Sequence, residues 1–328
     1  MLGYFFRRFV YAIITIWAVS IISFIIIQLP PGDYVTAYLA QLAAQGSSLN
    51  MSEAENLRVY YGLDQPLYVQ YFKWAGHMIR GDLGFSFEHQ KPVTEVIGER
   101  LFLTAVIALL AVVFTWIIAI PVGIFSAVHQ YSFWDYTFTF FGFIGLAIPN
   151  FLLALILMWV GFSVFDLNVG GLFSPEYLVA PWSWGRFVDL MAHLWVPVLV
   201  LGIAGTAQII RITRANLLDE LRKPYVVTAK AKGLTEWQVI MKYPVRLALN
   251  PVVSMTAYIW PFLVSGSVIV SVVLSLPTIG PVLLRSLVSQ DMFLAGSIIM
   301  LIGMMTVIGT FLSDLLLLWV DPRIRMDS

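Results

Sequence analysis

The stretch from Arg211 to Pro251 reads RITRANLLDELRKPYVVTAKAKGLTEWQVIMKYPVRLALNP, a long basic segment between two apolar runs. It holds eight Lys and Arg residues against three acids. Gly233 accepts a positive φ at no steric cost, which suits the residue just after a helix end. Thr235 and Gln238 have the spacing of a capping box, which begins a new helix. The pattern predicts a helix, a glycine bend and a second helix that could be presented to a partner protein.

The composition of the chain is that of a membrane protein. Its 328 residues are 59% hydrophobic and only 12% charged, whereas about a quarter of the residues of a soluble domain are charged. The absence of cysteine excludes a disulfide framework and a thiolate metal site. The net charge is zero, so the charge of the whole chain gives no indication of nucleic-acid binding, and none is expected.

Six apolar runs predict an all-α polytopic protein with six transmembrane helices, because each run can cross about 30 Å of hydrocarbon. They cover residues 9–29, 101–128, 139–165, 193–210, 251–274 and 294–320. The first run is longer than the apolar part of a signal peptide and no small-residue cleavage site follows it. The third run contains Pro149, which membrane helices tolerate where neighbouring groups satisfy the freed carbonyl.

The distribution of Lys and Arg predicts the orientation. With both termini inside, the inner segments hold twelve of them and the outer segments seven, five of these in the long segment 33–100, as the positive-inside rule requires. We expect an N-terminal transmembrane helix (1–30), a small helical extracytoplasmic subdomain (31–100) and a five-helix core (101–328) with a cytoplasmic coupling loop (211–250). Between the last two runs, residues 277–291 form a short outer loop that could dip back into the membrane.

The chemistry of an enzyme within the membrane is missing from the apolar runs. Ionisable groups at depth indicate function, and only His193, at an outer end, and Asp314, about two turns before an inner end, occur in the runs. We interpret both as interface or packing residues. The sequence contains no zinc-protease motif, no nucleophile elbow and no phosphate-binding glycine loop. We therefore expect no catalytic residue, no metal site and no bound cofactor in this chain.

Neutral polar residues recur in the later runs instead. The plainest interpretation is hydrogen bonding and close packing between helices. As a set they would also suit the wall of a wet pathway for a neutral or zwitterionic solute. The candidate pathway-lining residues are Asn150, Gln208, Ser265 and Ser267.

Motifs along the whole chain resemble permease subunits of binding-protein-dependent ABC importers of the dipeptide, oligopeptide and nickel class. The central matches are RITR at 211–214 and YVVTAKAKGL at 225–234, which resemble the loop that docks on the ATPase. The others are PGD at 31–33, GLDQP at 62–66, GDLG at 81–84 with Ser86, PV at 92–93, NP at 250–251, Pro277 with Gly280, and DPRIR at 321–325. The chain departs from the family pattern at Pro224, Val227 and Thr278, where an acid, arginine and glycine are usual.

The resemblance implies a type I importer fold in the inner membrane of a bacterium. The implied partners are a second homologous permease, two ATP-binding cassette subunits that hold ATP and magnesium, an extracytoplasmic solute-binding protein and membrane lipid. The resemblance also implies the residues that couple to the ATPase. These are Tyr225, Thr228, Ala229, Lys230, Ala231, Lys232, Gly233 and Leu234.

Three alternatives stay open on the sequence. The same machinery could import an oligosaccharide or an opine-like conjugate in place of a peptide. The chain could be a membrane scaffold that transports nothing, with 211–250 an ordinary basic loop. The third alternative, a membrane-embedded enzyme, has the least support because the site residues it needs are missing.

Overall fold

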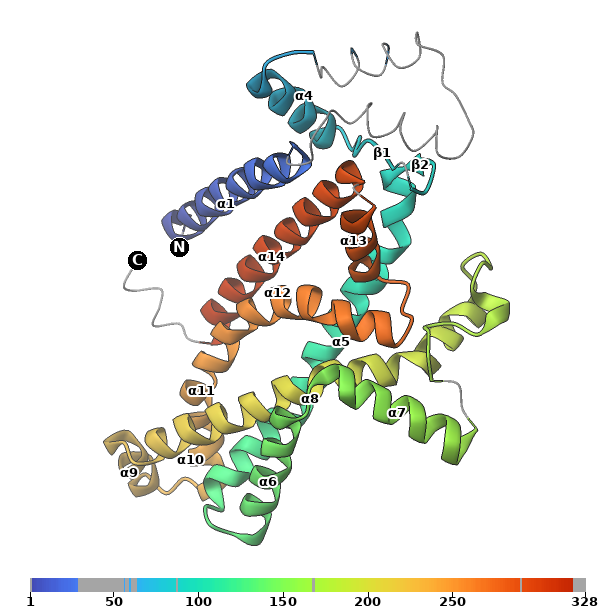
Figure 1. Cartoon of the computed structure of the whole chain (residues 1–328). Coiled ribbons are helices and arrows are strands. Elements are labelled where there is room, and N and C mark those ends of the chain that lie inside the picture. Colours follow the sequence, from blue (N-terminus) through green and yellow to red (C-terminus); the bar gives the residue numbers. More distant parts are fainter. Residues whose placement is uncertain are drawn as a thin grey trace. The chain divides into compact units, whose positions relative to one another are not determined.

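The computed structural model describes residues 2–28, 56, 59, 64–86, 88–166, 169–289 and 291–320, without the side chains of 2–5, 27, 256–267, 292 and 317–320. Within these residues the protein is built almost entirely of helices (Figure 1). The PGD and DPRIR motifs and the first two residues of GLDQP lie outside them.

The first half of the chain contains, in order, α1 (Leu2–Gln28), α4 (Leu67–Ile79), β1 (Phe85–Ser86), β2 (Lys91–Pro92), α5 (Val93–Val128), α6 (Phe133–Ala147) and α7 (Asn150–Phe165). The second half contains a 3₁₀ turn (Pro175–Tyr177), α8 (Trp184–Leu221), α9 (Pro224–Ala231), α10 (Glu236–Lys242), α11 (Pro244–Ala248), α12 (Asn250–Val273), α13 (Ile279–Val288) and α14 (Met292–Val320). The predicted all-α fold is confirmed, and the strands form only one short antiparallel hairpin.

Among the described residues, four helices are long and apolar enough to cross a membrane, namely α1, α5, α8 and α14. The bent pair of α6 and α7 makes a fifth candidate if the two are one span. The predicted run 251–274 coincides with α12, whose central side chains lie outside the described part of the chain. The count of six transmembrane helices therefore stays a prediction.

The predicted uninterrupted span over 139–165 is wrong. Helix α6 ends at Ala147, α7 begins at Asn150, and the two axes differ in direction by 101°. Proline has no N–H to continue a helix, and its ring pushes the preceding residue out of the helical region. Ile148 accordingly has an extended backbone with ψ 121°, and Pro149 is the N-cap of α7. Because membrane helices can also accommodate proline without breaking, the sequence alone does not decide that the chain turns here.

The chain divides into two compact units, of which unit 1 comprises residues 1–8, 103–277 and 308–328. Helix α8 is central to unit 1, because it packs against α6, α7, α11 and α12. Its 38 residues extend the predicted span 193–210 at both ends and carry the chain directly into the basic segment. A Cβ at Gly202 would lie 2.5 Å from Phe114 Cδ1, so glycine allows the close approach of α8 to α5.

Unit 2 comprises residues 9–102 and 278–307. Its short hairpin is held by Asp291, which accepts hydrogen bonds from Ser86 Oγ at 2.6 Å and Glu88 N at 3.2 Å. Glu88 in turn pairs with Arg285 of α13 and accepts from Ser289 Oγ. The loop predicted over 277–291 is therefore mostly helix, and polar contacts fix it to the hairpin within this unit.

Helix α4 packs against α1 in the same unit. Ser20 and Tyr71 join the two helices by a hydroxyl–hydroxyl hydrogen bond of 2.8 Å, and Gln28 Nε2 donates to Gln70 Oε1 at 2.8 Å. Next to these bonds, the rings of Phe24 and Trp74 lie 5.8 Å apart. Part of the segment expected to form an outer helical subdomain is thus a helix attached to the N-terminal span.

Candidate functional site

The predicted helix, glycine bend and helix are confirmed. We call α9, the bend and α10 the elbow (Pro224–Lys242). Gly233 has φ +79°, a conformation that glycine adopts without the steric cost of a Cβ. Thr235 Oγ1 then accepts a hydrogen bond from Gln238 N, and Gln238 Oε1 accepts one from Thr235 N. The capping box therefore starts α10 at the expected place.

The elbow has a small apolar core of its own. Val226 and Ala229 of α9 are buried against Val239 of α10, and Tyr225 and Leu234 pack around them. The core holds the two short helices against each other, although either one alone has too few residues to be stable in water.

Ala229 and Gly233 are four residues apart, a spacing that predicts one bare face of small residues on a helix, and this prediction is wrong. Ala229 is only 5% exposed and faces α10, while Gly233 lies beyond the last residue of α9, Ala231. A spacing of four residues places two positions on one face only while the helix continues. The exposed small residues of the elbow are Ala231 and Gly233, with Thr228 exposed beside them.

The outer surface of the elbow combines cations with two large apolar side chains. Lys230 and Lys232 are exposed, and Lys230 Nζ lies 3.5 Å from Glu236 Oε1 in a solvent-exposed ion pair. Val227 is 68% exposed and Trp237 is 66% exposed. Trp237 was not among the residues predicted from the sequence. Val239, two positions further on, is buried, so Trp237 lies on the opposite side of this short helix.

Tyr225 attaches the elbow to the end of α8. Its Oη donates to Glu220 Oε2 at 2.5 Å, across the break between α8 and α9. Pro224 occupies the first turn of α9, where the missing N–H of proline costs nothing. The departure from the family pattern at position 224 is thus compatible with the helix that follows.

A second set of contacts packs α11, in the basic segment, against α8 and α5. Leu217 of α8 and Ile124 of α5 form an apolar cluster with Val245 and Ala248 of α11. Helix α11 also packs against α10. These contacts join the elbow, through α11, to α8 and to the end of α5.

Asp135 and Arg214 form an ion pair that the sequence analysis missed. Arg214 Nε donates to Asp135 Oδ1 at 2.9 Å and Nη2 donates to Oδ2 at 2.8 Å. The side chain of Asp135 is 2% exposed and that of Arg214 is 26% exposed. The pair ties the first turn of α6 to α8, ten residues before α9 begins. The two residues are 79 positions apart, so no local pattern connects them.

The candidate pathway residues are placed only in part. Asn150 is half-buried at the first residue of α7, and Gln208 is exposed on α8. Ser265 and Ser267 lie in α12, with their side chains outside the described part of the chain. Their role in a pathway stays a prediction.

Asp314 of α14 forms an ion pair with Arg8 of α1. Arg8 Nη1 lies 3.0 Å from Asp314 Oδ2, and the Asp314 side chain is 16% exposed. The geometry fits the packing role that the sequence analysis preferred for this residue. Over the residues that the structure describes, no group of three or more His, Asp or Glu side chains is arranged to hold a metal ion.

Apolar helices of membrane length define a class of protein, the polytopic membrane proteins. Comparison with known proteins identifies the family. Residues 119–326 match the family model described as binding-protein-dependent transport system inner membrane component. Residues 1–108 match the model of the N-terminal part of such a membrane component. The chain belongs to the family of inner membrane components of binding-protein-dependent transport systems.

Relatives match the chain over nearly its full length. The oligopeptide transport system permease protein AppB of Bacillus subtilis is 35% identical over 99% of this chain and 100% of its own length. A putative peptide permease protein of Brucella suis is 32% identical over 99% of this chain and 100% of its own. The oligopeptide transport system permease protein OppB of Haemophilus influenzae is 29% identical over the same shares. These matches confirm the importer-permease class and the type I permease fold, and the scaffold and enzyme alternatives are not favoured.

Proposed function

We propose that this chain is one of two homologous permease subunits of an ABC importer for peptides and forms half of its translocation pathway. The observation that carries the proposal is an exposed basic elbow with a buried core of its own, in a chain of the importer family. The names of the relatives support a peptide as the solute. An oligosaccharide or opine-like conjugate has no comparable support.

In the proposed assembly, two ATPase subunits hold ATP and magnesium and each grips one elbow. Tyr225, Thr228 and residues 229–234 form the coupling element, with Ala229 acting from within the core of the elbow. A solute-binding protein delivers peptide from outside. The chain itself supplies no phosphate-binding glycine loop, so the proposal assigns all ATP hydrolysis to the partners.

Coupling requires an element with two arrangements whose balance the nucleotide shifts. In the proposal the elbow moves between the two arrangements as one rigid piece, because Val226, Ala229 and Val239 pack inside it. The bond between Tyr225 and Glu220 joins it to α8, and the cluster around Leu217 joins it to α5 and α11. Closure of the ATPase dimer would displace the elbow, and these contacts would pass the displacement to the helices.

Reconstitution tests the proposal. In proteoliposomes with the complete transporter, we expect uptake of a labelled oligopeptide that requires both ATP and the binding protein. Mass spectrometry of the loaded binding protein should find peptides. The purified chain alone should hydrolyse no ATP, and robust hydrolysis by it would refute the assignment. Uptake of an oligosaccharide with no uptake of peptide would refute the solute class only.

A second prediction concerns orientation, for which we propose cytoplasmic termini. The chain has no native cysteine, so single cysteines can be introduced without background. A cysteine at Val179, which is 96% exposed in the loop before α8, should react with an impermeant maleimide added to cells with a permeable outer layer and an intact inner membrane. A cysteine at Thr235 in the elbow should react only after lysis. The reverse pattern would overturn the orientation.

A further inference from the structure

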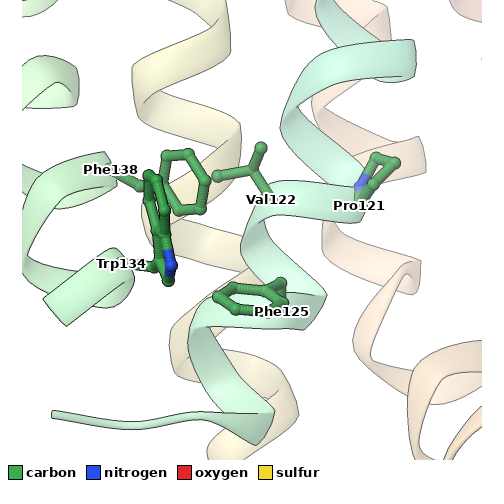
Figure 2. A pocket seen from close by; sticks show the side chains of 5 residues that line it. All are labelled: Pro121, Val122, Phe125, Trp134 and Phe138. Atoms are coloured by element: carbon green, nitrogen blue, oxygen red, sulfur yellow. The ribbon is translucent and has the colours of Figure 1, made fainter. Parts of the chain in front are cut away.

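An apolar groove lies on the surface of unit 1 between the second half of α5 and the first half of α6. Its lining consists of Pro121, Val122 and Phe125 from α5 and Trp134 and Phe138 from α6. Figure 2 shows Val122 and Phe125 of α5 on the side of Trp134 and Phe138 of α6, with Pro121 further along α5. The cavity measures about 510 Å³ and almost all of its lining surface is apolar.

The walls of the groove are built from stacked rings. The ring centroids of Trp134 and Phe138 lie 6.0 Å apart with nearly parallel planes, and Phe125 meets Phe138 edge to face at 6.0 Å. The ring of His129 stacks on Phe125 at 4.5 Å. These contacts hold bulky side chains in place, so the hollow between them is part of the local structure of α5 and α6.

The other face of each helix is already covered by α8. On α6, a Cβ at Gly145 would lie 2.8 Å from Ile203 and one at Gly142 would lie 3.8 Å from Ala207. Gly123 of α5 likewise lies close to Thr213. Helices in membranes associate through such small residues. The small-residue sides of α5 and α6 therefore face α8. The sides that carry bulky residues are not covered by α8.

We propose that the groove binds an acyl chain of a membrane phospholipid. Apart from the indole N–H of Trp134, its lining offers no polar group to a headgroup or a peptide, whereas hydrocarbon can enter it without losing hydrogen bonds to water. A partner helix would need small residues for close approach, but three of the five lining residues are aromatic. A flexible acyl chain can follow such an uneven wall.

The residues around the groove have the composition expected where a membrane protein meets the hydrocarbon and the interface of a bilayer. Ile117, Phe140 and Phe141 beside it are more than 60% exposed, so the groove continues the surface that faces hydrocarbon in this inner membrane protein. Tyr131 in the turn before α6 and Tyr136 in the first turn of α6 are also exposed, and aromatic residues with a polar group concentrate at membrane interfaces. Asp135 carries the one acidic side chain of this turn, and Arg214 neutralises it. Because this turn then presents no unpaired acidic group to the headgroup, we expect a lipid without net charge to bind.

Photocrosslinking tests the proposal in membranes that contain the complete transporter. The probe is phosphatidylethanolamine with a diazirine in its acyl chain, and mass spectrometry locates the labels. We expect labels to concentrate on the five lining residues relative to the exposed Ile117 and Phe141. Val122→Trp should fill the groove and reduce labelling of Trp134 and Phe138 by about fivefold, which corresponds to ~1 kcal/mol of lost binding.

The matched control is Val113→Trp, the same replacement at a 41% exposed position of the same helix. It should leave labelling of the groove unchanged, and the milder Val122→Phe should give an intermediate loss if Val122→Trp proves unstable. Uniform labelling of the wild-type surface would overturn the proposal. So would labelling of the isolated chain that disappears in the complete transporter, because the second permease would then cover the groove.

Discussion

Arg214→Ala is expected to lower the free energy of unfolding of the chain by about 3–5 kcal/mol, the usual effect of removing one member of a buried ion pair. The mutation removes the two N–H donors of the Arg214 guanidinium from the Asp135 carboxylate, which is 2% exposed. It also removes the link between α6 and α8 ahead of the elbow. The measurement is the midpoint of unfolding of the purified protein in detergent, followed by its helical signal.

Two comparisons make the explanation specific. Arg214→Lys should recover only part of the stability, because an ammonium cannot form the bidentate contact of a guanidinium. Replacing both partners, as in Asp135→Leu with Arg214→Met, should come close to the wild type, since no buried charge then remains. Glu236→Ala removes the exposed pair with Lys230 and should cost at most about 1 kcal/mol. A double variant as unstable as Arg214→Ala would rule out the uncompensated charge as the cause.

The parts of the site that were predicted correctly depend on neighbouring residues alone. The bend at Gly233 follows from backbone sterics, and the start of α10 follows from two side chains three residues apart, Thr235 and Gln238. The existence of the apolar helices α1, α5, α8 and α14 follows likewise from composition over about twenty residues. In each case the physical cause lies within the stretch that was interpreted.

The errors arose where tertiary packing decides the outcome. Pro149 could be accommodated in a continuous helix or could break it, and in the structure the chain turns there by 101°. Ala229 has the small side chain expected of an open docking face, but the apolar residues Val226 and Val239 enclose it. The pair of Asp135 and Arg214 joins residues 79 positions apart. A single sequence contains no local signal for such a contact.

Gly233→Asp is expected to reduce ATP-driven uptake by the complete transporter at least about tenfold, equivalent to ~1.4 kcal/mol or more in coupling. A Cβ at Gly233 would meet nothing within 4 Å in this chain, but the residue has φ +79°. An L-residue other than glycine pays about 1–2 kcal/mol in that conformation. The new carboxylate would also project from the exposed bend of the elbow, beside Lys232 and where we propose that the ATPase docks.

Three variants separate backbone strain from the blocked surface. Gly233→Asn has the same shape without the charge, and asparagine tolerates positive φ better than most residues, so it should keep more uptake than Gly233→Asp. Gly233→Ala introduces the strain with the smallest side chain. Lys223→Asp adds an acid outside the coupling motif, at the N-cap of α9, where a carboxylate favours the helix, and it should be mild.

Co-purification of the ATPase and peptide uptake must be measured together to interpret Gly233→Asp. The variant should still insert and bind the second permease, because a Cβ at position 233 would meet nothing within 4 Å. Loss of the ATPase from the complex would place docking at the elbow. A bound ATPase that hydrolyses ATP without uptake would place coupling there, through the joined contacts of Tyr225 and Leu217. Wild-type retention and wild-type uptake would show that the docking surface lies elsewhere, since neither the strained backbone nor the exposed carboxylate would then have disturbed it.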